Sequence, residues 1–307
     1  MPGFAPDLMQ DVRTRFAHVD SCPFQGQRIF FENAGGALTL NSAGETSTRF
    51  AAIPDNQGRD NPAAAALVEI IAAARADKQT FFNPDGGQYF VGERVTELTF
   101  RLNRTAVMAK DSSVIGSTVE HPASRSAAQH WAKMAGRPYI SVAHDDATGA
   151  VTPEAYTAQM TPDVTVATIL HTSPVTGIAN DVAGISAAIR AVAPEAYIVV
   201  DGIQHASHGH IDIEAYDIDG YVISPYKVFS RHGYGVAWVS DRLTALPVEQ
   251  LKDGPRANWE MGTRDTGAYA TFSDVVQYLD GLGGEHSDSE TPRHRIEAAG
   301  AAIHAHE

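Results

Sequence analysis

Short runs rich in valine and isoleucine alternate with helical segments through the middle of the chain. The runs expected to form strands are 114–118, 139–142, 165–171, 196–200 and 220–223. Helices are expected between them at 124–135, 153–160 and 182–192. Strands separated by helices pair in parallel, and the apolar faces of such a sheet require helices on both sides. The sequence therefore predicts a three-layer α/β fold built on a mainly parallel sheet.

The region before residue 114 gives a few further elements. Helices are expected at 6–19 and 67–81, a short strand at 28–31, and the start of another helix within 92–102. The domain organisation expected from these patterns has three parts. They are an N-terminal arm and helix at 1–27, one large domain at 28–283, and a linking helix at 284–307.

Charge and composition exclude several classes of partner. The 307 residues carry a formal net charge of −14, which repels nucleic acid phosphates and anionic membrane surfaces. The single cysteine, Cys22, excludes an internal disulfide framework, and the N-terminus lacks a basic start followed by an apolar run of secretory length. We therefore expect a soluble cytoplasmic protein that binds neither nucleic acid nor membrane.

Polar side chains follow the expected strands at the point where each strand ends. They are His121, His171, Asp201, Gln204 and Lys227. Ligands of open α/β sheets bind outside the carboxyl ends of the strands, where these residues would meet. We therefore expect the functional site at this edge of the sheet.

Asp201 and Lys227 have the chemistry that pyridoxal 5'-phosphate requires. The cofactor needs an amine that holds its aldehyde as a Schiff base, and an acid that keeps its ring nitrogen protonated. Both residues follow apolar strands, Tyr197–Val200 and Tyr221–Ile223. On these two residues alone, a surface lysine and an ordinary strand-end aspartate remain an alternative.

Further motifs resemble one family of enzymes that use this cofactor. The segments that carry the resemblance are Glu120-His-Pro-Ala123, Val200-Asp-Gly-Ile-Gln-His-Ala206, Ser224-Pro-Tyr-Lys227, Gly233-Tyr-Gly235 and Trp259-Glu-Met-Gly-Thr263. In this order and spacing they are similar to the class V aminotransferase and cysteine desulfurase family of fold-type I pyridoxal phosphate enzymes. The similarity extends from about residue 28 to 283.

The resemblance implies a role for each site residue. Lys227 would form the Schiff base, Asp201 would bind the ring nitrogen, His121 would stack on the ring, and Gln204 would donate to the phenolate oxygen. The residues implied to hold the cofactor phosphate are Val95 and Thr96 at a helix N-terminus, Ser224 and Tyr226 beside the lysine, and Thr263 reaching the partner's cofactor. The resemblance also implies an obligate homodimer that acts on an amino acid, and a small-residue loop at 32–36 near the substrate.

The sequence departs from the desulfurase pattern at several points. Tyr226 stands where the family prefers histidine, and Pro174 stands where many desulfurases have asparagine; Ser173 and Thr176 are possible substitutes. Cys22 precedes the first expected strand of the large domain, a position that disfavours sulfur relay through a protein thiol.

The chain is also expected to lack the family's small C-terminal domain, which commonly supplies the arginine for the substrate carboxylate. Arg231, Arg256 and Arg264 are the other candidates for that arginine. Desulfuration, transamination, elimination and racemisation all remain open.

Two alternatives come from other classes of function. His205, His208, His210 and Asp212 form a cluster that could hold zinc in a metal hydrolase, although their spacing misses the familiar ligand motifs. A non-catalytic or truncated protein of the pyridoxal phosphate fold is the second alternative. It would keep the dimer and show no turnover.

Overall fold

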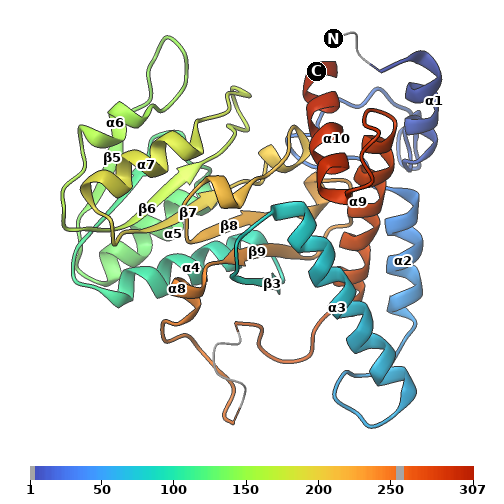
Figure 1. Ribbon diagram of the computed structural model, residues 1–307, viewed down its shortest axis with the longest axis horizontal. Helices are drawn as coiled ribbons and strands as arrows, with labels where there is room; N and C mark the ends of the chain where they lie inside the picture. Colours follow the sequence, from blue (N-terminus) through green and yellow to red (C-terminus); the bar gives the residue numbers. More distant parts are fainter. Residues whose placement is uncertain (1–3, 254–258) are drawn as a thin grey trace.

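The computed structural model describes residues 4–253 and 259–307. Within them, one seven-stranded sheet has the strand order β3-β9-β8-β7-β6-β4-β5. The strands are β3 (Gln88–Gly92), β4 (Ser113–Ser117), β5 (Tyr139–Val142), β6 (Val164–Leu170), β7 (Tyr197–Asp201), β8 (Gly220–Ile223) and β9 (Gly235–Val239). Neighbouring strands from β5 to β8 are parallel, whereas β9 is antiparallel to both β8 and β3. The predicted mainly parallel sheet is confirmed (Figure 1).

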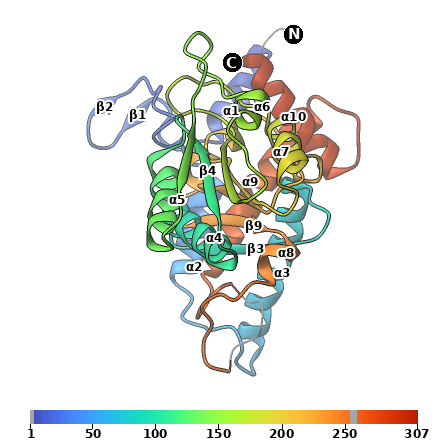
Figure 2. The ribbon, with the colours of Figure 1, turned by 90° about the vertical axis from the view of Figure 1, so that its left-hand side faces the viewer.

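Helices cover both faces of the sheet, as predicted. Helices α4 (Val95–Ala109) and α5 (Pro122–Met134) lie on one face, and α6 (Pro153–Thr157) and α7 (Val182–Val192) lie on the other (Figures 1 and 2). Successive side chains of β7 pack into two different hydrophobic cores, one on each face of the sheet. Ile198 packs in the core that contains Ile185 of α7, and Val199 packs in the core that contains Leu102 of α4. This alternation produces the continuous apolar runs of the sequence.

A layer of longer helices packs beside the β3 and β9 side of the sheet (Figure 1). It consists of α2 (Asn41–Ala51), α3 (Pro62–Phe82), α9 (Thr266–Gly284) and α10 (Pro292–His306). Helix α9 contacts the other three helices. The linking helix expected at 284–307 corresponds to α10, which packs on α9 and α3. None of the described helices has the length and apolarity that a membrane span requires.

Local capping explains where α3 begins and ends. Asn61 precedes the helix, and its side chain accepts a hydrogen bond from the backbone N–H of Ala64. Asn83 follows the helix with a φ of 49°, a left-handed conformation that asparagine tolerates at helix ends. The helix therefore includes the expected range 67–81 and begins earlier, at Pro62.

The strand predicted at 28–31 is wrong. The short strands β1 (Ser21–Cys22) and β2 (Gly26–Gln27) pair with each other just before it, and the expected range has no strand partner. Ile29 and Phe31 are 82 % and 91 % exposed. An apolar run forms a strand only when a neighbour supplies a ladder of backbone hydrogen bonds, and here only the N–H of Arg28 has such a partner, the carbonyl of Asp20, among the described residues.

Two expected helices are shorter than predicted. Helix α1 (Pro6–Thr14) ends before 19 because Phe16 forms an isolated bridge with Leu40 and His18 takes a positive φ of 57°. Helix α6 ends at Thr157, before the expected 160.

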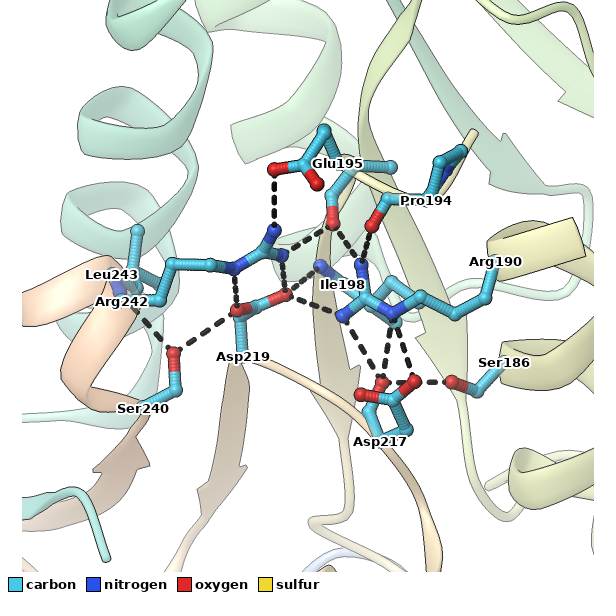
Figure 3. A network of polar contacts seen from close by, with 11 residues as sticks. Ser186, Arg190, Pro194, Glu195, Ile198, Asp217, Asp219, Ser240, Arg242 and Leu243 are labelled. Carbon is cyan, nitrogen blue, oxygen red and sulfur yellow. Dashed lines mark hydrogen bonds and ion pairs between the residues drawn. The ribbon is translucent and has the colours of Figure 1, made fainter. Parts of the chain in front are cut away.

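A buried ionic network joins strands at the amino ends of the parallel sheet, opposite the expected site (Figure 3). The carboxylate of Asp219, which directly precedes β8, accepts hydrogen bonds from the backbone of Ile198 in β7 and from Ser240 before α8 (Asp241–Thr244). It also forms ion pairs with Arg190 and Arg242. The network fixes β7, β8 and α8 in register, so the opposite strand ends have fixed positions.

Candidate active site

Asp201 ends strand β7 with its carboxylate buried, at 3 % exposure. Oδ2 accepts a hydrogen bond of 2.7 Å from the hydroxyl of Ser124, and Oδ1 accepts one of 3.1 Å from the backbone of Ile203. Burial raises the pKa of Asp201, whereas these two donors and the nearby His121 and Lys227 lower it. The net pKa of Asp201 remains raised, and these neighbours reduce the cost of the ionised carboxylate that a pyridinium would need.

Lys227 closes the short helical turn Pro225–Lys227, which follows strand β8. The residue is 8 % exposed, and its amine lies 6.0 Å from the centroid of the Tyr226 ring. Burial lowers the pKa of Lys227, and the carboxylate of Asp201 opposes that shift. A lysine amine with a lowered pKa is a better nucleophile near neutral pH.

One cavity of about 120 Å³ brings most of the predicted site residues together. Its lining includes six of them: Val95, Thr96, His121, Ser224, Tyr226 and Lys227. These residues come from α4, from the start of α5 and from the segment after β8, three regions far apart in the sequence. Asp201 lies outside the lining but is close enough to His121 and Lys227 for their charges to act on it.

The first turn of α4 contributes an anion-binding element to this cavity. Arg94 occupies the N-cap position, and its side chain makes no capping hydrogen bond. The lining includes Glu93, Arg94, Val95 and Thr96. Backbone N–H groups at an uncapped helix start, together with the positive end of the helix dipole, favour a phosphate group. Glu93 opposes such an anion.

His121 and Tyr226 are each held by contacts with other residues of the cavity wall. His121 is the N-cap of α5, and its Nδ1 accepts a hydrogen bond of 3.2 Å from the backbone of Ala123. The ring of Tyr226 stacks on His232 with centroids 4.3 Å apart. Its carbonyl accepts a hydrogen bond from the backbone N–H of Ala37, which follows the small-residue loop. That loop therefore packs against the residue next to Lys227.

Gln204 and Thr263 do not line the cavity. The side-chain amide of Gln204 donates a hydrogen bond of 2.9 Å to the carbonyl of Ala34 in the small-residue loop. Thr263 lines a neighbouring cavity of about 600 Å³, where its hydroxyl accepts a hydrogen bond from Asn56. The two cavities share Glu93, Gly233 and Tyr234 in their walls.

The arginines considered for the substrate carboxylate have other partners or are not described. Arg231 pairs with Asp265 at 2.5 Å, and Arg264 pairs with Glu260 at 3.0 Å. Arg256 lies outside the described residues. Neither described arginine lines the cavity that contains Lys227.

Ser173 and Thr176 form hydrogen bonds within their own loop. The hydroxyl of Ser173 accepts hydrogen bonds of 3.2 Å from the backbones of Val175 and Thr176. The hydroxyl of Thr176 accepts one from the backbone of Ile178. These contacts stabilise the turn around Pro174, and neither residue lines the cavity.

The histidine cluster after β7 is not arranged as a metal site. The rings of His205 and His171 stack with centroids 3.4 Å apart, and both nitrogens of His205 have hydrogen-bond partners, Thr172 and the carbonyl of His210. His208 instead pairs with Glu307. Among residues 4–253 and 259–307, no group of three histidine, cysteine or acidic side chains is positioned to hold a metal ion.

The structure adds residues that sequence analysis did not assign to the site. Ser124 contacts Asp201 directly, and His232 and Tyr234 line the cavity with Lys227. Ser124 follows His121 by three residues, at the start of an expected helix. This position could have indicated that its hydroxyl lies near the site. Tyr234 lies in the motif Gly233-Tyr-Gly235, which carried the resemblance without a role for the tyrosine, and His232 gave no signal, because it lies in the loop before a strand that was not predicted.

Comparisons with known proteins agree with this architecture. The model of the family described as Aminotransferase class-V matches residues 63–291. Among curated proteins, the chain is 29 % identical over 268 residues to the nonribosomal peptide synthetase-like enzyme fsqF of Aspergillus fumigatus, covering 82 % of the chain and 18 % of that protein. It is 25 % identical over 224 residues to a probable cysteine desulfurase of Mycoplasma genitalium, covering 70 % of the chain and 53 % of the relative.

Two further similarities extend the comparison. The cysteine desulfurase-like protein ustD of Aspergillus flavus is 26 % identical over 220 residues, covering 67 % of the chain and 48 % of that protein. The chain therefore spans about half or less of the length of each of these three relatives. The crystal structure of the cysteine desulfurase CsdA from Escherichia coli shares the fold with a TM-score of 0.75 at 21 % identity, covering 93 % of this chain and 77 % of that one. Since the family model covers most of the sequence, the chain belongs to the aminotransferase class-V family.

Proposed function

We propose that the chain is a pyridoxal phosphate-dependent enzyme that acts on an amino acid through Lys227, with cysteine desulfurase or lyase-like, or aminotransferase-like, chemistry. One observation carries the proposal. The lysine amine, the ring of His121 and the uncapped start of α4 line a single cavity, and the carboxylate of Asp201 is buried behind it.

The side chains and backbone groups around the cavity fit pyridoxal phosphate. The backbone of Val95 and the hydroxyl of Thr96 would hold the phosphate, together with Ser224 and Tyr226, which line the same cavity. Asp201 would bind the ring nitrogen through a charge-assisted hydrogen bond, and His121 would cover one face of the ring. When bound, pyridoxal phosphate supplies an aldehyde that condenses with an amine and a ring that withdraws electrons from the substrate carbon.

The protein groups then have separable tasks. Lys227 would accept the proton from the α-carbon of the substrate, and burial, which lowers the pKa of its amine, favours that role. Ser124 and the backbone of Ile203 keep the carboxylate of Asp201 in place. Gln204 holds the small-residue loop through Ala34, and its second amide hydrogen remains for a cofactor oxygen.

We also propose that two copies of the chain form the working enzyme. Thr263 lies outside the cavity that contains Lys227 and lines a larger neighbouring one, so it is free to serve a second copy. Light scattering of the loaded protein tests this part. A monomer that retains the cofactor would contradict it.

The central experiment is optical and covalent. Purified protein with added pyridoxal phosphate should develop a visible absorbance band, and borohydride should fix the cofactor onto Lys227, as located by peptide mass spectrometry. The variant K227A should lose the covalent label, whereas K133A, which removes an exposed lysine of α5, should keep it. Wild-type protein that binds no cofactor would refute the proposal. Loaded protein without turnover on any amino acid would favour the non-catalytic alternative.

A further inference from the structure

Glu120 is a buried acid beside the proposed cofactor site. It lies between strand β4 and His121, and its side chain is almost fully buried. Oε1 accepts a long hydrogen bond of 3.4 Å from the hydroxyl of Ser117, and the backbone of Ser117 and the hydroxyl of Thr168 also act to lower the pKa of Glu120. Oε2 has no hydrogen-bond partner among the residues that the structure describes. A buried carboxylate with so few donors is costly.

Asp201 is the acid whose charge acts on Glu120, and the two carboxyl groups have unequal surroundings. Asp201 has two short hydrogen-bond donors, Ser124 and the backbone of Ile203, and the charges of His121 and Lys227 also favour its ionised form. No cation contributes a comparable effect at Glu120. When two acids share a buried region, the one with the longer hydrogen bonds and no nearby cation retains the proton.

The remaining groups that face Glu120 cannot compensate its charge. Ser117 and Thr168 present neutral hydroxyls, and the phenols of Tyr139 and Tyr156 have pKa values that burial raises. The hydroxyl oxygens of Thr168 and Tyr139 would lie 2.4 Å and 2.6 Å from a Cβ on Gly116, and neither has a hydrogen-bond partner within the described chain. A protonated carboxyl group can donate to such an oxygen, which a carboxylate cannot do.

The electrostatics agree with the geometry. Burial, and then the charge of Asp201, raise the pKa of Glu120 to about 8. Burial also raises the pKa of Asp201, but Ser124, Ile203, His121 and Lys227 act against that shift.

We infer that Glu120 retains the proton of a buried carboxyl pair, so that Asp201 alone presents a negative charge to the ring nitrogen of bound pyridoxal phosphate. Glu120 is then a positioning residue, which acts through Asp201 and does not touch the cofactor. Its assignment toward the cofactor rests on the proposed function, whereas the protonation of the pair is a property of the cofactor-free protein.

Infrared difference spectroscopy of cofactor-free protein tests the protonation directly. Between about pH 6 and pH 10, the wild type should lose a protonated-carboxyl band, with a midpoint in the range where Glu120 ionises. The band should be absent in E120Q and retained in E69Q, a matched change of an exposed glutamate on α3. In D201N the midpoint should move to lower pH, because the neighbouring charge is gone. A band that persists in E120Q, or a midpoint that D201N leaves unchanged, would overturn the inference.

Cofactor titration tests the consequence. Glutamine resembles the protonated acid, so E120Q should bind pyridoxal phosphate at pH 7 with a dissociation constant within about twofold of wild type, whereas D201N should bind about tenfold more weakly or worse. If E120Q weakened cofactor binding as much as D201N does, a negative charge on Glu120 would be needed for binding, and the inference would be contradicted. If the wild-type protein shows the infrared behaviour but binds no cofactor, the proposed function is refuted, whereas the inference that Glu120 retains the proton still holds.

Discussion

The hydroxyl of Ser124 donates a hydrogen bond of 2.7 Å to Oδ2 of Asp201, although the two residues are 77 positions apart in the sequence. Ser124 lies in the first turn of α5, and Asp201 ends strand β7. Both side chains are buried. The first turn of α5 thus fixes the orientation of the acid that we place under the cofactor ring.

Removing that hydroxyl should weaken cofactor binding. In S124A, Asp201 loses a donor that lowers its pKa, so its ionised form becomes less stable. We expect the dissociation constant for pyridoxal phosphate to rise about tenfold, because a hydrogen bond to a charged group contributes roughly 1.5–3 kcal/mol. Equilibrium titration by absorbance measures the change. The control S126A removes an exposed hydroxyl from the same helix and should leave binding unaltered.

The start of α4 should be needed for the phosphate group. In T96V the hydroxyl is lost and the backbone N–H is kept, so we expect weaker binding of pyridoxal phosphate with little change for pyridoxal, which has no phosphate. Comparing the two dissociation constants isolates the phosphate interaction. T48V, in the exposed part of α2, is the matched control. Equal weakening for both ligands would argue against phosphate binding at Thr96.

Gly235 allows α4 to approach strand β9 closely. A Cβ at this position would lie 2.5 Å from the backbone N of Val95 and 2.8 Å from the carbonyl carbon of Arg94. Backbone atoms cannot rotate away, so G235A should destabilise the fold by roughly 3 kcal/mol and displace the helix start. Chemical denaturation measures the loss. G44A, in α2 where a Cβ meets nothing within 4 Å, should instead stabilise by about 0.5–1 kcal/mol.

Lys78 predicts a pH dependence of stability. Its amine is fully buried near the rings of Tyr269 and Phe272, at 4.1 Å and 5.1 Å, and burial lowers its pKa to about 7. Above that pH the unfolded chain keeps the proton and the folded protein does not. The free energy of unfolding should therefore rise with pH above about 7, at up to about 1.4 kcal/mol per pH unit.

The variant K78M removes this dependence. Between about pH 7 and pH 9, the wild type should gain stability relative to K78M, and at pH 6 K78M should be the more stable protein because no charge is buried. Denaturation curves at several pH values measure the difference. K110M, at an exposed position after α4, should follow the wild type throughout. A constant difference between K78M and wild type would show that Lys78 does not titrate in this range.

The network around Asp219 should be important for stability alone (Figure 3). Its buried carboxylate pairs with Arg190 and Arg242, so D219N should cost roughly 3–5 kcal/mol of unfolding free energy. D217N is the matched control, because the side chain of Asp217 is 77 % exposed, so its ion pair with Arg190 lies in solvent, and the hydrogen bonds from Ser186 and Arg190 to its backbone carbonyl are kept. We expect a change within about 0.5 kcal/mol for D217N. Cofactor affinity of the folded D219N protein should match wild type.

Much of the architecture was predictable because it follows from local pattern. The strands β5 and β8 and the helix α7 have the predicted bounds, since alternating apolar segments of suitable length have few other solutions. The antiparallel β9 and its neighbour β3 were not predicted. Each is only five residues long, and β9 is apolar without the alternation that would mark an antiparallel strand, because both faces are buried.

The sequence by itself determined the chemistry at the strand ends: an acid after β7, a lysine after β8, and a helix start with an available hydroxyl. Only the tertiary structure decided which of these groups meet, that Ser124 supports Asp201, and that Gln204 holds the loop at Ala34. The physical reason is that residue type and spacing act over a few turns of chain. Contacts between distant side chains depend instead on strand order and register, which the packing of the whole core sets.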